Sequence, residues 1–356
     1  MKFIHTADIH WGMVPDSEKP WSRERTQAIR DTFGQIVEKA REEAADFLLI
    51  SGDLFHRQPL ARDLKEINYL FSTIPTVRVL LTAGNHDRIR PSSALYSFHW
   101  CSNVTCFLES RMESVYFADC NVEIHGFSYH AAEDKDPHAE ILSVPKDGRI
   151  HILMLHGGDA SHIPFDRQAL LGAGYAYVAL GHIHKPEIFA GNRMAYPGSP
   201  EPLDKTETGE HGILAGELDP ASGKVTSLKL IPMSRSRYIP LAVNISVSTT
   251  NAELEQKIAR EIEKRGKNHI YRFRIKGMRD PDIRFDYQEL MNRYRIIEIL
   301  DESEPQYDFS ALYAEHAGDM IGFYIRALQG PDRSPVEKKA LFYGIHALLL
   351  TQDERN

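Results

Sequence analysis

The stretch that most constrains this chain is Gly84-Asn85-His86-Asp87, which directly follows the apolar run 77–81. A run rich in apolar and β-branched residues predicts a buried parallel strand, and Gly84 allows the backbone to turn sharply at its end. An amide, an imidazole and a carboxylate are then delivered at one strand end, where ligands collect in open α/β sheets. The alternative interpretation is a polar turn in which Asn85 and Asp87 cap the next helix.

Four further strand-like runs end in residues of the same chemical kinds. The polar residues at these ends are Asp8 and His10 after 2–7, Asp53 and His56 after 47–50, His156 after 150–155, and His182 and His184 after 175–180. Helical apolar spacing fills residues 22–45 and 61–72, between the first strands. Strands that alternate with helices in this way predict a layered α/β fold.

Two of these motifs carry their polar side chains two residues apart. Because alternate residues of a strand share a face, we expect Asp8 and His10 to project to one side. We expect the same of His182 and His184. Each pair is therefore a candidate chelating group for one ion.

The donor types favour a transition metal. Oxygen ligands combined with imidazoles suit Mn²⁺, Fe or Zn²⁺ better than Ca²⁺. The chain has 17 histidines, and several stand beside Gly, Asp or Asn at strand ends, which also points to metal. His125, His130 and His138 lie in a weaker context, and we expect them to be solvated. The three cysteines include no CxxC pair, so neither a disulfide framework nor a zinc ribbon is indicated.

The order DxH, GDxxH, GNHD, H and GHxH resembles the calcineurin-like metallophosphoesterase family. The resemblance implies a layered α/β/β/α sandwich and two divalent metal ions, most readily Mn²⁺, with Fe or Zn²⁺ as alternatives. It assigns one ion to Asp8, His10 and His184, the other to Asn85, His156 and His182, and a bridging position to Asp53. Two such ions bind a phosphodiester and lower the pKa of a water, so the implied reaction is phosphodiester hydrolysis.

Three residues beside the expected ligands are candidate catalytic groups. In the resemblance His86 faces the scissile phosphate, where a protonated imidazole stabilises developing charge or protonates the leaving oxygen. Asp87 is expected either to orient His86 through its ring N–H or to cap the backbone. His56 lies one helical turn beyond Asp53 and is expected to contact the substrate phosphate, with plain solvent exposure as the alternative.

Residues 196–202, Tyr-Pro-Gly-Ser-Pro-Glu-Pro, followed by Glu207 and His211-Gly212, resemble a segment of the SbcD-like nucleases. That resemblance implies a DNA exonuclease that acts on DNA ends in repair, together with an SbcC-like coiled-coil ATPase subunit. For the Gly-Ser pair of this segment it implies a place beside the metal cleft, where the backbone shapes the path of a DNA strand. A plain β-turn is the alternative.

We expect three parts: a nuclease domain at residues 1–233, a smaller α+β capping domain at 238–304, and a C-terminal helical segment at 305–356. In the second part, Arg272, Arg274 and Lys276 alternate with apolar residues along a strand. This alternation gives one basic face, which suits either phosphate binding or an ordinary exposed sheet surface. The apolar positions of the third part fit either partner binding or packing on the cap.

The resemblance also implies a homodimer formed through helices of the nuclease domain. Ile67, Leu70 and Phe71 offer an apolar stripe for such a contact, although the same stripe can face the sheet.

Two other functions remain open. The formal net charge of −8 favours a phosphoesterase for small nucleotides or phosphodiesters over a binder of long nucleic acids. Alternatively, the chain mainly holds an ATPase subunit as a scaffold. No apolar run approaches the roughly 20 residues that span a bilayer. The first residues contain no signal-peptide core, so we expect the cytoplasm and no membrane partner.

Overall fold

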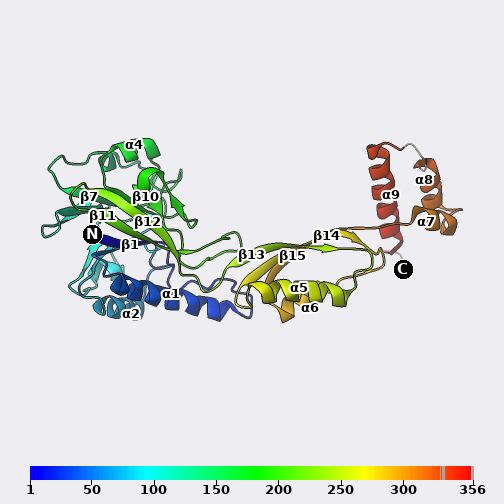
Figure 1. Cartoon of the computed structure of the whole chain (residues 1–356), viewed down its shortest axis with the longest axis horizontal. Coiled ribbons are helices and arrows are strands. Elements are labelled where there is room, and N and C mark those ends of the chain that lie inside the picture. The colour runs from blue at the N-terminus through cyan, green and yellow to red at the C-terminus, as the bar shows by residue number, and fades with distance from the viewer. Residues whose placement is uncertain (329, 331–332, 354–356) are drawn as a thin grey trace. The chain divides into compact units, whose positions relative to one another are not determined.

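The computed structural model describes residues 1–328, 330 and 333–353, which form two compact units (Figure 1). The first unit comprises Met1–Ile239 and Asn268–Ile270, and the second comprises Pro240–Lys267 and the chain from Tyr271 onward. The second unit holds both the expected capping domain and the expected helical segment. The boundary expected between these two parts stays a prediction. Residues 329, 331–332 and 354–356 of that segment lie outside the described part of the chain.

The first sheet of unit 1 has six strands in the order β12-β11-β1-β2-β3-β4. Its strands are β1 (Lys2–Thr6), β2 (Phe47–Ser51), β3 (Arg78–Thr82), β4 (Val104–Phe107), β11 (Gly212–Asp219) and β12 (Lys224–Pro232). β1 to β4 are parallel, with Ile4 opposite Leu48 and Leu48 opposite Val79. The hairpin of β11 and β12 runs antiparallel along β1 and closes this edge.

The second sheet has the order β5-β6-β7-β8-β10-β9. Its strands are β5 (Glu113–Phe117), β6 (Val122–Gly126), β7 (Ile150–His156), β8 (Tyr177–Gly181), β9 (Glu187–Ile188) and β10 (Met194–Tyr196). The four inner strands are parallel, and β5 and β9 pair antiparallel at the two edges. The carboxyl ends of β7 and β8 complete the group of strand ends that carry the polar motifs.

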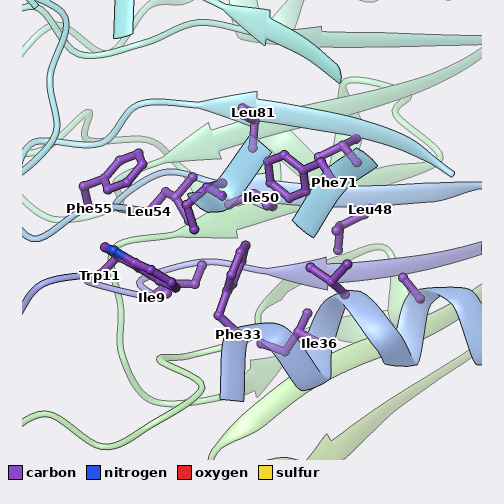
Figure 2. Close-up of a cluster of buried hydrophobic side chains, with 14 of the residues drawn as sticks. Ile9, Trp11, Phe33, Ile36, Leu48, Ile50, Leu54, Phe55, Phe71 and Leu81 are labelled. Carbon is purple, nitrogen blue, oxygen red and sulfur yellow. The ribbon is translucent and has the colours of Figure 1, made fainter. Parts of the chain in front are cut away.

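Three apolar clusters separate four layers, and they follow from the period-two alternation of the strands. Ile4, Leu48 and Ile50 face α1 (Ser22–Glu42) and α2 (Ala61–Ser72), whose apolar stripes pack on them. Figure 2 shows Phe33 and Ile36 of α1 directed at these strands, beside Trp11 and Phe71. The expected α/β/β/α sandwich is thereby confirmed in its first two layers.

The opposite faces of the same strands meet the second sheet. Phe3 and Phe47 pack with Ile124 and Ile152 between the two sheets. On the outer face of the second sheet, Leu153 and its neighbours lie against α4 (Arg167–Gly172) and η1 (Ala139–Leu142). Figure 1 shows α1 and α2 on one side of the strands and α4 on the other, which completes the sandwich.

The apolar stripe of α2 faces inward. Ile67 and Phe71 are fully buried in the cluster under the first sheet, and Leu70 packs against that cluster. Of the two interpretations of this stripe, packing against the sheet is the one that the structure supports.

Two short helical turns, three strands and two longer helices complete unit 1 and the cap. These are α3 (Ala94–Ser97), η2 (Ala190–Asn192), β13 (Tyr238–Ile245), α5 (Asn251–Arg265), β14 (Ile270–Arg279), α6 (Tyr287–Arg293) and β15 (Ile296–Pro305). The cap sheet has the order β13-β14-β15, with β14 and β15 parallel. Tyr271, Phe273 and Ile275 of β14 are buried on one face of this sheet.

The expected basic face of β14 is neutralised by the neighbouring strand. Arg272 pairs with Glu298, and Arg274 and Lys276 both reach Glu302, at 3.5 and 3.6 Å. Of the two interpretations of this face, an ordinary exposed sheet surface with cross-strand ion pairs is the one the structure supports.

The C-terminal segment contains α7 (Phe309–Glu315), α8 (Met320–Leu328) and α9 (Pro335–Asp353), packed through Ile321, Ile325 and Leu341. The apolar positions after Phe309 form two helices because Asp319 accepts hydrogen bonds from the backbone N–H of Ile321, at 2.9 Å, and so caps a new helix. Within the described ranges, we find no helix with the length and apolar character that crossing a membrane requires.

Candidate metal centre

The carboxyl ends of β1, β2, β3, β7 and β8 bring the expected ligands together. The residues that the structure gathers here are Asp8, His10, Asp53, Asn85, His156, His182 and His184. His156 is the last residue of β7, the others follow their strands within a few residues, and the strands are adjacent in the two sheets. Residues separated by more than a hundred positions in the sequence therefore meet at one edge of the sandwich.

One group of donors contains Asp8, His10 and His184. The Nε2 atoms of His10 and His184 are 3.2 Å apart, and His184 Nε2 lies 3.8 Å from Asp8 Oδ1. Asp8 and His10 are completely buried, whereas His184 is half-buried. Three donor atoms at these separations form a compact set for one divalent ion.

Asp53 lies between this group and a second one. Its Oδ2 is 3.6 Å from His10 Nε2 and 3.4 Å from His156 Nε2. The same nitrogen of His156 lies 3.1 Å from the side-chain oxygen of Asn85. The ring of His182 is next to that of His156, with 5.3 Å between centroids. One carboxylate therefore faces nitrogen donors on both sides, as a bridging ligand does.

The backbone, rather than strand geometry, directs these side chains. β1 ends at Thr6, and Asp8, His10 and Asp53 have φ near +50°, in the left-handed region that few residues other than glycine adopt. The premise that Asp8 and His10 project together because a strand continues is wrong. The loops after β1 and β2 are instead joined by backbone bonds, including His10 N–H to the Asp53 carbonyl at 3.0 Å.

The two imidazoles of the HxH motif separate in the same way. β8 ends at Gly181, and His182 has φ of +96°. His182 then turns toward His156, while His184 turns toward His10. The expectation that both rings face one way is wrong, and this outcome agrees with the assignment of one histidine to each ion.

Two glycines make room for the donors. A Cβ on Gly84 would lie 2.3 Å from Asp53 Oδ1 and 2.7 Å from His156 Nε2. Gly52 has φ of +87°, and a Cβ there would lie 2.3 Å from His156 Nδ1. Glycine is required at both positions because any side chain would displace a donor atom.

Hydrogen bonds to the second ring nitrogen fix which nitrogen each histidine presents. His156 donates Nδ1–H to the Ser51 carbonyl at 2.9 Å, and His184 donates Nδ1–H to Glu207 Oε1 at 2.7 Å. Both rings therefore turn Nε2 toward the centre with its lone pair free. His182 donates Nε2–H to Asp159 at 2.7 Å, so Nδ1 is its atom for an ion.

Asp159 was missed by the sequence analysis, and Glu207 was noticed without a role. Asp159 lies three residues beyond His156, and it also contacts His162 Nδ1 at 3.0 Å. A carboxylate just after a strand-end histidine is a weak signal, since exposed loops often contain Asp. Only the fold brings it to His182.

The charges of the centre are strongly coupled. Burial raises the pKa of Asp8 to about 6 despite the attraction of His156 and His184. Burial also opposes ionisation of Asp53, but His156, His10 and His86 attract its charge more strongly and hold its pKa below its usual range. Burial lowers the pKa of His10 well below its usual value, so this imidazole is neutral.

The same balance raises two imidazole pKa values. For His156, burial works against protonation, but attraction by Asp53 and Asp8 raises the pKa to about 9. Glu207 and Asp8 likewise overcome burial at His184, with a pKa of about 9. The protons on His156 and His184 neutralise the negative charge of the buried carboxylates, as a bound cation would. Two buried carboxylates, an amide and four imidazoles thus fit two divalent ions.

His86 stands beside the donors with an exposed ring. Its backbone N–H binds Asp53 Oδ1 at 2.9 Å, and its Nδ1–H is held by the His56 carbonyl at 3.1 Å. The Nε2 atom is therefore the one available to a ligand. The ring of His56 stacks on it with 5.1 Å between centroids.

Asp87 is buried and holds the backbone of both loops. Its oxygens accept the N–H of Phe55 at 3.0 Å and of Gly84 at 2.8 Å. The capping interpretation therefore describes its contacts, and the expected bond to the His86 ring is wrong because His86 Nδ1 binds His56 instead. Burial and the charge of Asp53 raise the pKa of Asp87 to about 7.

His56 contacts one of the expected metal ligands, His10. Its Nδ1 lies 3.2 Å from His10 Nδ1, so a phosphate contact from His56 would use Nε2. The ring is half-buried, and burial followed by repulsion from His86 lowers its pKa.

The segment 196–202 contacts His184 and Glu207 and so helps to position a ligand of the centre. Ser199 is fully buried; its N–H binds the His184 carbonyl at 3.1 Å and its hydroxyl binds Glu207 at 3.1 Å. Glu201 forms a buried ion pair with Arg25 of α1 at 3.1 Å. These contacts show a scaffold for His184; a role in guiding DNA stays a prediction.

Two of the three histidines expected to be solvated are buried. His125 is 5% exposed and His138 is 9% exposed, whereas His130 is exposed as expected. His138 lies between Asp134 and Glu140, at 2.9 and 3.2 Å, which raise its pKa against the effect of burial. The surroundings of His125 depend on strand register, which the sequence does not reveal.

Comparison with known proteins adds independent findings. Residues 1–186 match the family model described as calcineurin-like phosphoesterase. The chain is 27% identical over 291 residues to the DNA double-strand break repair protein Mre11 of Methanopyrus kandleri, covering 73% of this chain and 63% of that protein. It is 30% identical over 233 residues to the uncharacterized metallophosphoesterase YhaO of Bacillus subtilis, covering 60% and 56%.

A second Mre11, from Archaeoglobus fulgidus, is 27% identical over 332 residues, with 84% of this chain and 73% of that protein covered. The chain spans about three fifths of the length of the first two relatives.

Proposed function

This chain belongs to the calcineurin-like phosphoesterase family, and from that premise we propose that it is a two-metal phosphodiesterase that hydrolyses DNA. The observation that carries the proposal is the place of Asp53, whose Oδ2 faces His10 on one side and His156 on the other. A bridging carboxylate between two nitrogen-rich donor sets suits two ions on one phosphate.

The residues that would hold the ions divide into two sets. Asp8, His10 and His184 would hold the first and Asn85, His156 and His182 the second, with Asp53 shared. When bound, two divalent ions supply the positive charge that polarises a phosphodiester and acidifies a water. Mn²⁺ is our first expectation for both ions, with Fe or Zn²⁺ also compatible with these donors.

His86 is our candidate catalytic residue. Its Nδ1–H is occupied by the His56 carbonyl, so a protonated ring would point its Nε2–H outward. From there the imidazolium can donate to the leaving oxygen or to a phosphoryl oxygen. Asp87 and His56 take positioning roles in this proposal, because Asp87 holds the backbone of Gly84 and His56 contacts His10.

DNA is the proposed substrate because two of the relatives are named as DNA double-strand break repair proteins. We further propose an SbcD-like exonuclease that acts on DNA ends in repair, in the cytoplasm, where its free thiols Cys101, Cys106 and Cys120 stay reduced. A phosphodiesterase for small nucleotides is the second candidate, and the net charge of −8 favours it.

The C-terminal helices are the proposed binding site for a coiled-coil ATPase subunit of the SbcC type. Met320 and Phe323 of α8 and Tyr343 of α9 are large apolar residues with 68%, 49% and 59% of their surface exposed. Such residues fit a helix-in-groove contact. A homodimer is also proposed; it would use residues other than Ile67 and Phe71, which are buried.

The test is hydrolysis of end-labelled double-stranded and single-stranded DNA with Mn²⁺, beside bis(p-nitrophenyl) phosphate. We expect metal-dependent shortening from the ends, and loss of both activities in Asp53→Asn. Turnover of the small diester with DNA intact, also after an ATPase partner is added, would favour the second candidate.

Deletion of residues 309–356 separates the enzyme from the scaffold. We expect the truncated chain to lose the ATPase partner while it still hydrolyses the small diester. Unchanged partner binding would remove the assignment of these helices. A full-length chain that binds the partner but hydrolyses neither substrate would identify a scaffold.

A further inference from the structure

A second group of metal-ligand side chains lies at the opposite end of the second sheet. Glu123 and His125 belong to β6 and His151 to β7, and one donor atom from each lies within 4.8 Å of the others. His151 precedes His156 by five residues on the same strand, which at about 3.3 Å per residue places the two roughly 16 Å apart. This group is therefore separate from the metal centre.

Strand register assembles the group. Glu123 is the cross-strand partner of His151, and His125 follows Glu123 by two residues on the same face. All three are buried, at 9%, 5% and 4% exposure. Sequence separation hides this relationship, because the two strands are joined by a long connection.

The donor separations suit a zinc-type ion. His125 Nε2 lies 2.9 Å from His151 Nδ1, and that nitrogen lies 3.7 Å from Glu123 Oε2. Donors on one tetrahedral Zn²⁺, with bonds of about 2.0–2.1 Å, lie about 3.3 Å apart. The two measured separations lie on either side of this value, so small movements bring all three atoms into range.

Hydrogen bonds around the group orient its donors. His151 donates Nε2–H to Asp147 Oδ1 at 3.0 Å, so the lone pair on its Nδ1 faces His125 Nε2. Glu123 Oε1 accepts from Ser114 at 2.7 Å, and Arg149 binds Oε2 at 3.0 Å. The carboxylate oxygen retains a second lone pair for an ion. A carboxylate behind a ligating histidine is typical of metal sites.

A cavity of about 410 Å³ adjoins the group and is lined in part by Arg149, His151 and Tyr175. Of the three side chains, His151 lines this cavity, so a water on this side would complete the four-fold coordination of an ion held by three protein ligands. Burial, partly opposed by Glu123, lowers the pKa of His125, which keeps this ring in its neutral form.

We propose that Glu123, His125 and His151 form a second binding site for a single transition-metal ion of the Zn²⁺ class, distinct from the two-ion centre. The ion would tie β6 to β7 and, through Asp147, to the loop before β7. The proposal does not depend on the function assigned to the main centre. A hydrogen-bonded chain from His125 through His151 to Asp147, with no ion, is the competing account.

The test counts Zn²⁺ per chain by equilibrium dialysis and elemental analysis. We expect His125→Gln to bind one equivalent less than the native chain, with hydrolysis of the small diester unchanged. His130→Gln, which removes an exposed histidine five residues later in the chain, should bind as the native chain does. Equal stoichiometry in the native chain and His125→Gln would overturn the proposal.

Co²⁺ spectra and the Zn²⁺ affinity of a carboxylate variant test the same site independently of the Zn²⁺ count. With Co²⁺, the native chain should show visible bands of a four-coordinate site beside those of the main centre, and His125→Gln should remove only the former. Glu123→Gln keeps the size and the bond to Ser114, so it addresses the case in which histidine variants fold poorly. We expect its Zn²⁺ dissociation constant to rise at least tenfold; an unchanged constant would contradict the proposal.

Discussion

His184 and Glu207 share a hydrogen bond of 2.7 Å from Nδ1–H to Oε1, although they come from different loops. The other oxygen of Glu207 accepts from Ser199 and from the backbone N–H of Leu203, at 3.1 and 2.8 Å. The carboxylate is thus fixed on one side and orients an expected metal ligand on the other.

Glu207→Gln should weaken the first metal position. The amide can still meet His184 but lacks the charge that strengthens the imidazole as a ligand, so we expect a roughly 10- to 100-fold loss of metal affinity or activity. Metal titration followed by diester hydrolysis measures this. Glu210→Gln, which alters an exposed partner of Arg237, is the matched control. Equal affinity in both variants would contradict the role of Glu207.

His86→Ala should lower hydrolysis by roughly 10²- to 10⁴-fold, the range for loss of a proton donor in the transition state. Metal content should stay at the native level, because His86 contributes only its backbone N–H to Asp53. Elemental analysis and turnover on the same sample separate the two effects. His130→Ala should change neither quantity. Loss of metal in His86→Ala would identify a ligand or a structural role instead.

Arg25→Met should strongly destabilise the fold. Arg25 and Glu201 are 1% and 2% exposed, and removing the guanidinium leaves a buried carboxylate without its counter-ion, a cost of about 3–5 kcal/mol. Urea denaturation measures the free energy of unfolding. Adding Glu201→Gln should recover part of the loss, while Arg41→Met, in an exposed pair, should cost little. Additive losses in the double variant would show that the pair is not coupled.

His5 should make stability fall in acid. Burial lowers its pKa to about 3, while in the unfolded chain the value is near 6.5. Between these values the unfolded chain binds a proton that the native chain does not. The contribution to stability is therefore complete above pH 6.5 and falls by about 1.4 kcal/mol per pH unit below it.

The His5→Gln variant isolates this contribution. The difference in unfolding free energy between the native chain and His5→Gln should shrink steadily from pH 6.5 to pH 4, measured on metal-free protein by urea denaturation. A difference that stays constant over this range would show that His5 is protonated equally in both states.

Much of the fold could be predicted because local pattern and tertiary environment agree. Phe3 and Ile4 are adjacent apolar residues, and they enter the clusters on opposite faces of the first sheet. The polar residues after each run could be expected to meet, because carboxyl ends of parallel strands share an edge. The apolar pattern of the strands accounts for the sandwich, and the shared edge of the strand ends accounts for the set of donors.

The remainder depends on register and on backbone conformation. Glu123 meets His151 only because β6 and β7 pair in one register, and a shift by one residue would turn His125 to the other face. The separation of His182 from His184 follows from a left-handed residue that no spacing rule anticipates. The direction of Ile67 could not be predicted, since an apolar stripe suits a core and an interface equally.

The left-handed backbone at Asp8, His10 and Asp53 restricts which residues these positions can exchange. Asp, Asn and His are the residues other than glycine that tolerate this conformation best. Chain geometry and coordination chemistry therefore select the same short set of amino acids. A β-branched residue would lose the donor atom and add a conformational cost of about 1–3 kcal/mol. Substitutions at these three positions are therefore limited both by the backbone conformation and by the need for a metal ligand.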